Sequence, residues 1–459
     1  MHVHVPFGEG TLAVDLPDRT VTIRGEAGAR LTAVPDLEAE VRRALEQPLD
    51  EPRVGQRVGP GARVLIAFDD PTGMCFAPLR QTVIRQLLAD LERAGVRRED
   101  VFLMCANSLH RKSRPEELRV ILGDELVDEF GSQITCHDAE DPDQLVYLGQ
   151  TPGGYDVELN RQVIDSDLTI YVNAAHNRGF SGGWKSVCVG LSTYRSIRHH
   201  HSPDGMSMSL AHNPMHAMLD EMGALTESKL RQPIFKVDTL LASPFEVARV
   251  LAGSVGATRR AAIETLSTTM PARRNLAGEK FDVVIYGVPD WSPYAIFASM
   301  NPLLTLVSSG LGYLGGTAQA IGKPGCSVIL ATPCPDRWDR VHHPSYPLVW
   351  KEVLTQTRDP YKIQSEFAER YLTDRELLQK YRDEFAFHPV HAILATYPLK
   401  RLQHFGQVYV AGATDPAVVS HLGFVPTPTI DEALAMAEAK HGDDCSIAYV
   451  APPAAFSTH

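Results

Sequence analysis

Short apolar runs and longer amphipathic segments alternate along the first part of this chain. The apolar runs fall at residues 64–68, 101–105, 133–136 and 168–172. Residues 79–94 repeat their apolar positions with a helical period and stop at Gly95, and the charged stretch 115–129 predicts another helix. Strands that alternate with helices favour a parallel sheet whose connections are helical crossovers.

Other segments before residue 270 have weaker patterns. Residues 1–25 alternate apolar and polar positions on either side of Asp18-Arg19, which predicts a hairpin. Short helices are expected at 37–45 and 159–165, and two helices at 244–266.

A second alternating pattern begins at residue 281. Its expected strands are 281–287, 326–331, 407–411 and 446–450, and its expected helices are 296–308 and 430–440. The glycine-rich run 310–316 follows a helix pattern and not a strand, which favours a turn over a dinucleotide loop. We therefore predict an α/β fold with two domains, mostly parallel sheets and an active site in the cleft between them. The domains are 1–267 and 281–459, joined by a linker at 268–280, with the last residues packing back on the first domain.

Polar, reactive side chains follow each of the first four strands. They are Asp70 and Thr72, then His110, then His137 and Asp138, and finally His176. In open parallel sheets, ligands bind outside the carboxyl ends of the strands. A single histidine is usually structural, but several at one edge of a sheet predict a catalytic site.

The stretch 173–186 carries the strongest chemical signals. It contains, in order, Gly179, Gly182, Gly183, Lys185 and Ser186. Such glycines allow a sharp turn whose N–H groups form an anion-binding nest. Trp184 separates the last glycine from the lysine, so the spacing does not fit a nucleotide-hydrolase P-loop. A histidine run, His199-His200-His201, follows and adds candidate metal ligands.

Composition narrows the class of protein. The formal net charge of −12 argues against general nucleic-acid binding, which needs a basic face. No apolar run approaches a membrane span, and the first residues lack the regions of a signal peptide. The seven cysteines are scattered, odd in number and without a C-x-x-C pair, as expected of free thiols in a reducing compartment. We expect a soluble cytoplasmic protein without nucleic-acid or membrane partners.

Taken in order, the motifs resemble those of the lactate racemase family, the nickel-pincer-nucleotide-dependent 2-hydroxyacid racemases and epimerases. The resemblance covers most of the chain and is strongest in the first domain. Its motifs are Asp70-Pro-Thr72, Asn107-Ser-Leu-His110-Arg111, His137-Asp138, Leu145-Val-Tyr-Leu-Gly149 and Gly179-Phe-Ser-Gly-Gly-Trp-Lys185-Ser186. The resemblance implies an isomerase that inverts C2 of a 2-hydroxy acid by reversible hydride transfer to the cofactor, through a 2-keto acid. It also implies a small-molecule substrate and cofactor-biosynthesis proteins as partners.

The resemblance implies a covalent and a metal contact to the cofactor, pyridinium-3,5-bisthiocarboxylic acid mononucleotide nickel. Lys185 matches the lysine that anchors the cofactor through a thioamide. His201 matches the nickel-binding histidine, and either His199 or His200 serves if the loop shifts. Further cofactor contacts are implied at Asp70, Thr72, Gly182, Gly183 and Ser186.

Two acid–base histidines are implied as well. His110 matches one of them, and His176 resembles the other. His176 lies one residue closer to Lys185 than the family pattern expects, and Ala175 holds that place unless the loop has a one-residue deletion. Histidine suits the task because its ordinary pKa lies near neutrality.

Two basic contacts to a substrate carboxylate are absent from the sequence. The family usually has arginine at the position of Gly73, and a second-domain lysine has no counterpart in 301–316. The polar candidates in that segment are Ser308, Ser309 and Tyr313, and the candidate replacement arginines are Arg80, Arg178 and Arg195. Met74, Phe76 and Trp184 are expected to line the volume that the missing guanidinium frees. Because lactate offers only a methyl group in compensation, we expect a larger 2-hydroxy acid to be preferred.

Two other classes of function fit part of the pattern. One is a metal-dependent hydrolase built on His110, His137, Asp138 and the histidine run, which needs three protein ligands and an open water position. The other is a protein that holds the nickel nucleotide without turnover. The hydrolase leaves Lys185 and the glycines without a role.

Overall fold

The computed structural model describes residues 1–24, 31–174, 182–205, 214–269 and 279–451. The chain forms two compact units. We call Arg30–Thr269 with Leu378–His388 the central unit, because both chain ends belong to the other one. The terminal unit comprises Met1–Ala29, Met270–Leu377 and Pro389–His459.

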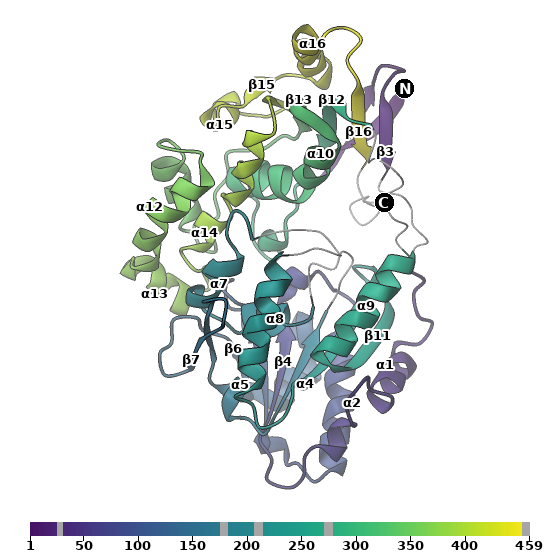
Figure 1. Ribbon diagram of the computed structural model, residues 1–459, viewed down its shortest axis with the longest axis vertical. Helices are drawn as coiled ribbons and strands as arrows, with labels where there is room; N and C mark the ends of the chain where they lie inside the picture. Colours follow the sequence, from purple (N-terminus) through teal and green to yellow (C-terminus); the bar gives the residue numbers. More distant parts are fainter. Residues whose placement is uncertain (25–30, 175–181, 206–213, 270–278, 452–459) are drawn as a thin grey trace. The chain divides into compact units, whose positions relative to one another are not determined.

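The central unit is built on a sheet with the strand order β11-β10-β9-β4-β5-β6 (Figure 1). Its strands are β4 Val64–Asp69, β5 Val101–Ala106, β6 Ile134–Cys136, β9 Leu168–Asn173, β10 Phe235–Ser243 and β11 Glu246–Ser254. All neighbours pair in parallel except β10 and β11, which form an antiparallel edge. The predicted parallel sheet is confirmed, and its central strand β4 is buried almost throughout, as its apolar run requires.

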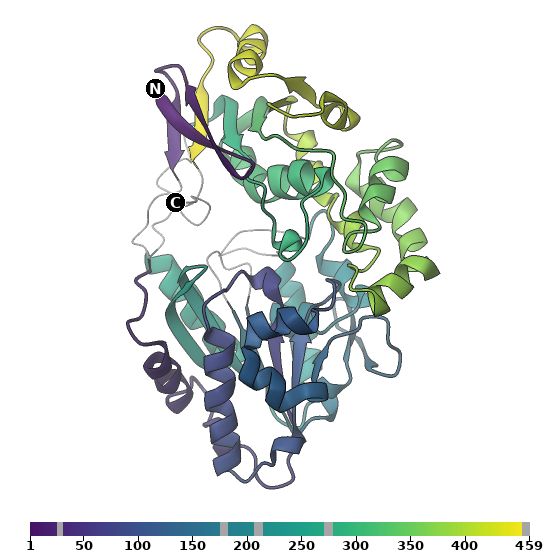
Figure 2. The same cartoon turned by 180° about the vertical axis from the view of Figure 1, so that it is seen from behind.

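Helices cover both faces of this sheet (Figures 1 and 2). They are α1 Leu37–Glu46, α2 Leu79–Arg93, α3 Pro115–Leu122, α4 Asp124–Phe130, α5 Gln162–Asp165, α6 Lys185–Gly190, α7 Tyr194–His200, α8 Pro214–Glu227 and α9 Val255–Thr269. A separate hairpin pairs β7 Leu145–Gln150 with β8 Asp156–Asn160. Helix α2 buries Val83, Leu87 and Leu91, which its helical period places on one face, in the core beneath β4 and β5.

The terminal unit has a sheet with the strand order β15-β14-β13-β12-β16-β3, in which every neighbouring pair is parallel. Its strands are β3 Val21–Arg24, β12 Phe281–Gly287, β13 Gly322–Ala331, β14 Gln407–Ala411, β15 Val425–Thr427 and β16 Ile447–Ala451. An antiparallel hairpin, β1 His2–Phe7 with β2 Gly10–Asp15, precedes them. The helices are α10 Gly315–Ile321, α11 Tyr346–Leu348, α12 Pro360–Leu372, α14 His391–Leu394, α15 Pro416–His421 and α16 Ile430–His441. The helix α13 Arg375–Asp383 begins in this unit and continues into the central unit from Leu378.

The division of the chain differs from the predicted boundaries 1–267, 268–280 and 281–459. The N-terminal strand β3 pairs with β16 near the other end of the chain (Figure 1), which places the first residues in the terminal unit. Residues 378–388 join the central unit, where the Tyr381 hydroxyl accepts a hydrogen bond of 2.9 Å from the Ala139 amide. These long-range pairings leave no mark on a local apolar pattern.

Four local predictions are wrong. The N-terminal hairpin turns after Phe7 and not at Asp18-Arg19. The predicted helix 115–129 is broken at Gly123, whose φ is 82°. One strand, β11, and one helix, α9, occupy the region of the two helices expected at 244–266. The run 310–316 is helical and not a turn.

The described helices include none that is both long enough and apolar enough to cross a membrane.

Candidate functional site

The central sheet has a switch point between β4 and β9. The chain leaves β4 through α2 to β5 on one side, whereas β9 pairs with the other side of β4. Asp69 and Asp70 lie at the carboxyl end of β4, and Asn173 ends β9. Such a point is where an open α/β sheet forms a ligand crevice.

Asp70 and His110 form a hydrogen-bonded pair at this edge. Asp70 Oδ2 lies 2.7 Å from His110 Nδ1, and Asp70 Oδ1 accepts hydrogen bonds from the amide and the hydroxyl of Thr72. Burial by itself raises the pKa of Asp70, but the charge and hydrogen bond of His110 and the Thr72 hydroxyl outweigh it and hold that pKa below its ordinary value. The side chain of His110 is 20% exposed, so a ligand can reach it.

His137 is held by its neighbours and is not available as a base. The Asn107 amide donates to the carbonyls of His110 at 3.1 Å and His137 at 3.0 Å, which ties the ends of β5 and β6 together. His137 Nε2 donates to the Ser192 carbonyl at 3.0 Å, and its Nδ1 lies 3.3 Å from the Asn160 amide. Burial lowers the pKa of His137 to about 4. Both ring nitrogens are thus engaged, which disfavours the hydrolase.

Asp138, the carboxylate of the hydrolase hypothesis, is also engaged by its neighbours. It pairs with Lys112 at 2.8 Å and Arg382 at 3.4 Å. No group of three histidine, cysteine or acidic side chains arranged to hold a metal occurs in the described part of the chain.

The glycine turn before α6 has the backbone conformation that its sequence predicts. Gly182 and Gly183 have φ values of 80° and 56°, which favour glycine. A Cβ at Gly183 would lie 2.6 Å from Arg259 Cδ, so the position is also crowded. The hydroxyl of Ser186 donates to Asn173 Oδ1 at 2.8 Å and fastens the start of α6 to the end of β9.

Lys185 is the first residue of α6, and its side chain is partly exposed. Burial of the Lys185 amine lowers its pKa to about 8, and the charge of Lys236 adds to this effect. Asp69 and Asp70 act in the opposite direction, which places both carboxylates near the amine. A substantial fraction of Lys185 is therefore a neutral amine near pH 8.

Sequence reasoning missed Lys236 on β10. It is fully buried, its Nζ lies 3.4 Å from the Gly183 carbonyl, and it stands 4.4 Å from the ring centroid of Tyr171. Burial lowers the pKa of Lys236 and raises that of Asp69 to about 6, whereas Tyr171 donates to Asp69 at 2.8 Å. The available signal was Lys236 and Asp238 alternating with apolar residues in a strand.

The three histidines of the run have different environments. His199 Nε2 lies 3.1 Å from the amide and 3.2 Å from the carboxylate of Asp156. His200 is fully buried, its Nδ1 is 2.7 Å from His201 Nδ1, and its Nε2 has no hydrogen-bond partner among the described residues. Burial and the charge of Lys185 lower the pKa of His200 to about 3, so this ring is neutral.

Arg80 does not replace the arginine missing at Gly73. Its guanidinium is buried and donates to the backbone carbonyls of Asp69 at 2.9 Å, Cys75 at 3.0 Å and Asp70 at 3.1 Å. A Cβ on Gly73 would lie 3.4 Å from the Ala174 carbonyl and 3.6 Å from Arg80 Nη2. Arg80 thus holds the loop that carries Asp70.

Other predicted residues lie elsewhere or outside the described residues. Arg195 lies 3.5 Å from Glu158 and stacks 3.7 Å from the ring centroid of Tyr147. His176 and Arg178 fall outside the described residues.

The two aromatic residues expected near Gly73 differ in exposure. Phe76 is 43% exposed and stacks on Phe245, which is 69% exposed. Trp184 is buried against α8, where a Cβ on Gly223 would overlap its ring. That Trp184 and Phe76 line one volume stays a prediction.

In the terminal unit, the polar candidates 308–313 lie in an apolar helix. The Ser309 hydroxyl donates to the Trp291 carbonyl at 3.3 Å, and Tyr313 is hydrogen-bonded to Tyr294. Ser308 is buried. None of these three side chains carries the positive charge of the lysine that is absent from 301–316.

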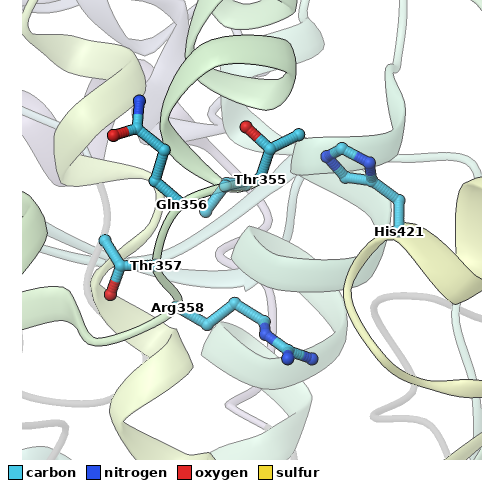
Figure 3. A pocket seen from close by; sticks show the side chains of 6 residues that line it. Thr355, Gln356, Thr357, Arg358 and His421 are labelled. Carbon is cyan, nitrogen blue, oxygen red and sulfur yellow. The ribbon is translucent and has the colours of Figure 1, made fainter.

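A surface hollow of about 470 Å³ also lies in the terminal unit (Figure 3). It is lined by Leu354, Thr355, Gln356, Thr357, Arg358 and His421. Arg358 donates to the Leu422 carbonyl and His421 stacks on Trp350, so these side chains serve local structure. None of the sequence-predicted site residues lies there.

The central unit is therefore a parallel α/β domain with a lysine, an acid–histidine pair and a buried histidine near its switch point. Comparison with known proteins agrees with this description of the central unit. Residues 7–211 match the family described as lactate racemase N-terminal domain.

Curated relatives include two lactate racemases. The protein of Thermoanaerobacterium thermosaccharolyticum is 26% identical over 226 residues, which are 47% of this chain and 51% of the relative. The protein of Lactiplantibacillus plantarum is 24% identical over 225 residues, with the same shares. The first part of the chain is thus similar to the lactate racemase family, and the match spans about half the length of these relatives.

Solved structures extend the likeness in fold to the whole chain. The lactate racemase apoprotein of T. thermosaccharolyticum has a TM-score of 0.69 at 20% identity and covers 98% of each chain. A protein of Thermotoga maritima has a TM-score of 0.52 at 14% identity, over 91% of this chain and 96% of the other. The predicted α/β class is confirmed.

Proposed function

We propose that this protein is a racemase or epimerase that inverts C2 of a 2-hydroxy acid, using a nickel-pincer nucleotide attached to Lys185. The single observation that carries the proposal is Lys185, an amine of lowered pKa in the same electrostatic environment as Asp70. Its partner Asp70 is bound to His110, so an anchoring group and an acid–base group occur together at one switch point. The relatives named lactate racemase support this reading.

The residues present fit such a cofactor. An amine must lose its proton to form an amide-like bond, and a pKa of about 8 makes that loss easy for Lys185. The left-handed turn at Gly182 and Gly183 brings backbone close without a Cβ, as an anionic nucleotide requires. When bound, this cofactor supplies a carbon that accepts and returns a hydride.

His110 has the environment of a general base. Its Nδ1–H donates to Asp70, which fixes the tautomer and makes Nε2 the nitrogen that takes a hydroxyl proton. The lowered pKa of Asp70 keeps its carboxylate ionised, so it stabilises the imidazolium that forms. For the opposite enantiomer a second base must act, and we assign that role to His176.

For nickel, the geometry of the run favours His200 over the predicted His201. The short contact between the two Nδ1 atoms requires that one of them carry a proton. If His200 is the donor, its buried Nε2 presents a lone pair that no described residue satisfies. A neutral imidazole with a free lone pair is a good nickel ligand, and His201 then fixes the tautomer of His200.

We propose that the preferred substrate is larger than lactate. Gly73 offers no guanidinium, and Arg80 is committed to backbone carbonyls. A small carboxylate thus lacks a bidentate anchor, which costs it several kcal/mol. The exposed side chains of Phe76 and Phe245 offer apolar surface to a larger substituent.

Co-expression with the cofactor-biosynthesis proteins tests attachment. The purified protein should carry a mass adduct on the Lys185 peptide and racemise single enantiomers of at least one 2-hydroxy acid. Lys185→Ala should lose adduct and activity together, whereas Lys229→Ala, a change at an exposed lysine of the same unit, should lose neither. Active enzyme with unmodified Lys185 would contradict the proposal.

Nickel content separates the histidines. We expect His200→Ala to lose most of the bound nickel, with smaller losses in His199→Ala and His201→Ala. Circular dichroism should show that each variant remains folded. Full nickel in His200→Ala, or a larger loss in His201→Ala, would return the assignment to His201.

For the substrate, a panel of enantiopure 2-hydroxy acids should be followed by loss of optical purity. We expect lactate to be slower than acids with larger side chains. Lactate turnover equal to the best of the panel would refute the larger-substrate proposal without touching the attachment.

A further inference from the structure

Two cysteines stand side by side behind the Asp70–His110 pair. Cys105 on β5 and Cys136 on β6 are register partners in the parallel sheet, so their side chains point to the same face. Both belong to or border the apolar core on that face. Paired residues on adjacent strands lie about 4.8 Å apart, which is within the roughly 4.4–6.8 Å Cα spacing that a disulfide accepts.

The thiols are in contact and have unlike environments. They share a hydrogen bond, which with burial raises the pKa of Cys105 well above its ordinary value. The same hydrogen bond, a backbone hydrogen bond of Ser113 and the charge of Lys112 together hold the pKa of Cys136 below its ordinary value despite burial. Cys105 is fully buried, whereas Cys136 is partly exposed. Cys136 is therefore the thiol that a small reagent reaches first.

We propose that Cys105 and Cys136 are a redox-sensitive dithiol that peroxide converts to a disulfide. The Cys136 thiolate attacks one oxygen of hydrogen peroxide, the O–O bond breaks, and a sulfenic acid and water form. The Cys105 sulfur then attacks Cys136 Sγ, the S–O bond breaks, and a second water leaves. The balance is two thiols and one peroxide to one disulfide and two waters, with the sulfurs oxidised and the peroxide reduced.

This pair is coupled to the site by position. Cys105 and Cys136 each precede a segment that Asn107 binds, through the carbonyls of His110 and His137. A disulfide brings the two sulfurs to about 2.05 Å, closer than any hydrogen-bonded thiols. The adjoining ends of β5 and β6 must shift, and His110 with them. Oxidation should therefore lower turnover reversibly.

The test is a peroxide titration of the full chain, followed by alkylation of remaining thiols under denaturing conditions and peptide mapping. We expect the Cys105 and Cys136 peptides to appear cross-linked, with the loss of two hydrogen atoms, before the other cysteines react. Dithiothreitol should reverse the cross-link. Cys136→Ser should abolish it, and the matched variant Cys75→Ser, at a buried cysteine on the same face, should leave it intact.

Either of two results would overturn the proposal. One is a Cys105 and Cys136 pair that remains fully alkylated after peroxide has oxidised other cysteines. The other is oxidation of Cys136 to sulfinic acid with no cross-link to Cys105. Because mapping reads the bond itself, neither result depends on the racemase assignment.

Discussion

The lowered pKa of Lys185 predicts that this amine reacts at a pH where ordinary lysines do not. With a pKa of about 8, roughly a tenth of Lys185 is neutral at pH 7. A lysine with a pKa of about 10.5 is only ~0.03% neutral at that pH. The ratio is about 300, but a less basic amine is also a weaker nucleophile, as in the thiol series. A Brønsted slope of about 0.4–0.5 over about 2.5 pKa units lowers the nucleophilicity about 10–18-fold, so we expect a net advantage of roughly 20-fold.

The assay is brief acetylation of the cofactor-free protein across a range of pH, with each lysine peptide quantified by mass spectrometry. Labelling of Lys185 should rise with a midpoint near pH 8, because only the neutral amine reacts. Lys362, which is half exposed on α12, serves as the comparison within each sample. Asp70→Asn removes a charge that raises the pKa of Lys185, so the midpoint should move to lower pH.

Two results would refute this reasoning. A Lys185 profile that coincides with that of Lys362 would show that burial does not lower its pKa. An upward shift of the midpoint in Asp70→Asn would show that the carboxylate does not act on the amine. Neither measurement needs the cofactor or the substrate.

Three further substitutions test the frame of the site by urea unfolding. Arg80→Met leaves three buried carbonyls without their donor and should cost about 3–5 kcal/mol; a loss below about 1 kcal/mol would contradict that role. Asp69 has a pKa of about 6 in the folded protein, above its unfolded value, so the folded state holds a proton that the unfolded state has lost between these two pKa values. The wild type should therefore lose stability relative to Asp69→Asn as the pH rises from about 4 to 6. The same pH dependence of stability in both proteins would contradict the raised pKa. Gly183→Ala needs a left-handed alanine and meets Arg259, so it should cost at least about 1–2 kcal/mol, and an unchanged midpoint would be inconsistent with the turn.

The order of strands and helices in the central sheet was readable from sequence. The apolar runs 64–68, 101–105 and 168–172 are strands, and 79–94 is the helix α2. These patterns can be read within each segment. A buried parallel strand must be apolar on both faces, and a helix that covers the sheet must be apolar on one face. The polar residues that follow such strands then mark one edge, which is why Asp70 and His110 could be placed together.

Pairings across long stretches of chain could not be read in this way. β3 joins β16, and residues 378–388 complete the central unit, although neither segment differs in pattern from its neighbours. The strands β10 and β11 were missed, although Lys236 and Asp238 alternate with apolar residues in β10. Such alternation is typical of a strand with one exposed face, so the burial of Lys236 could not be read from it.

The sequence by itself determined which chemical groups the site around Lys185 contains, because the identities and the order of residues such as Asp70 and His110 are what the motifs consist of. Tertiary structure alone decided what each group can do. It tied both nitrogens of His137, buried His200 beside His201, and committed Arg80 to carbonyls. The physical reason is that burial, charge and hydrogen bonding depend on neighbours brought together by the fold, and these set protonation and availability.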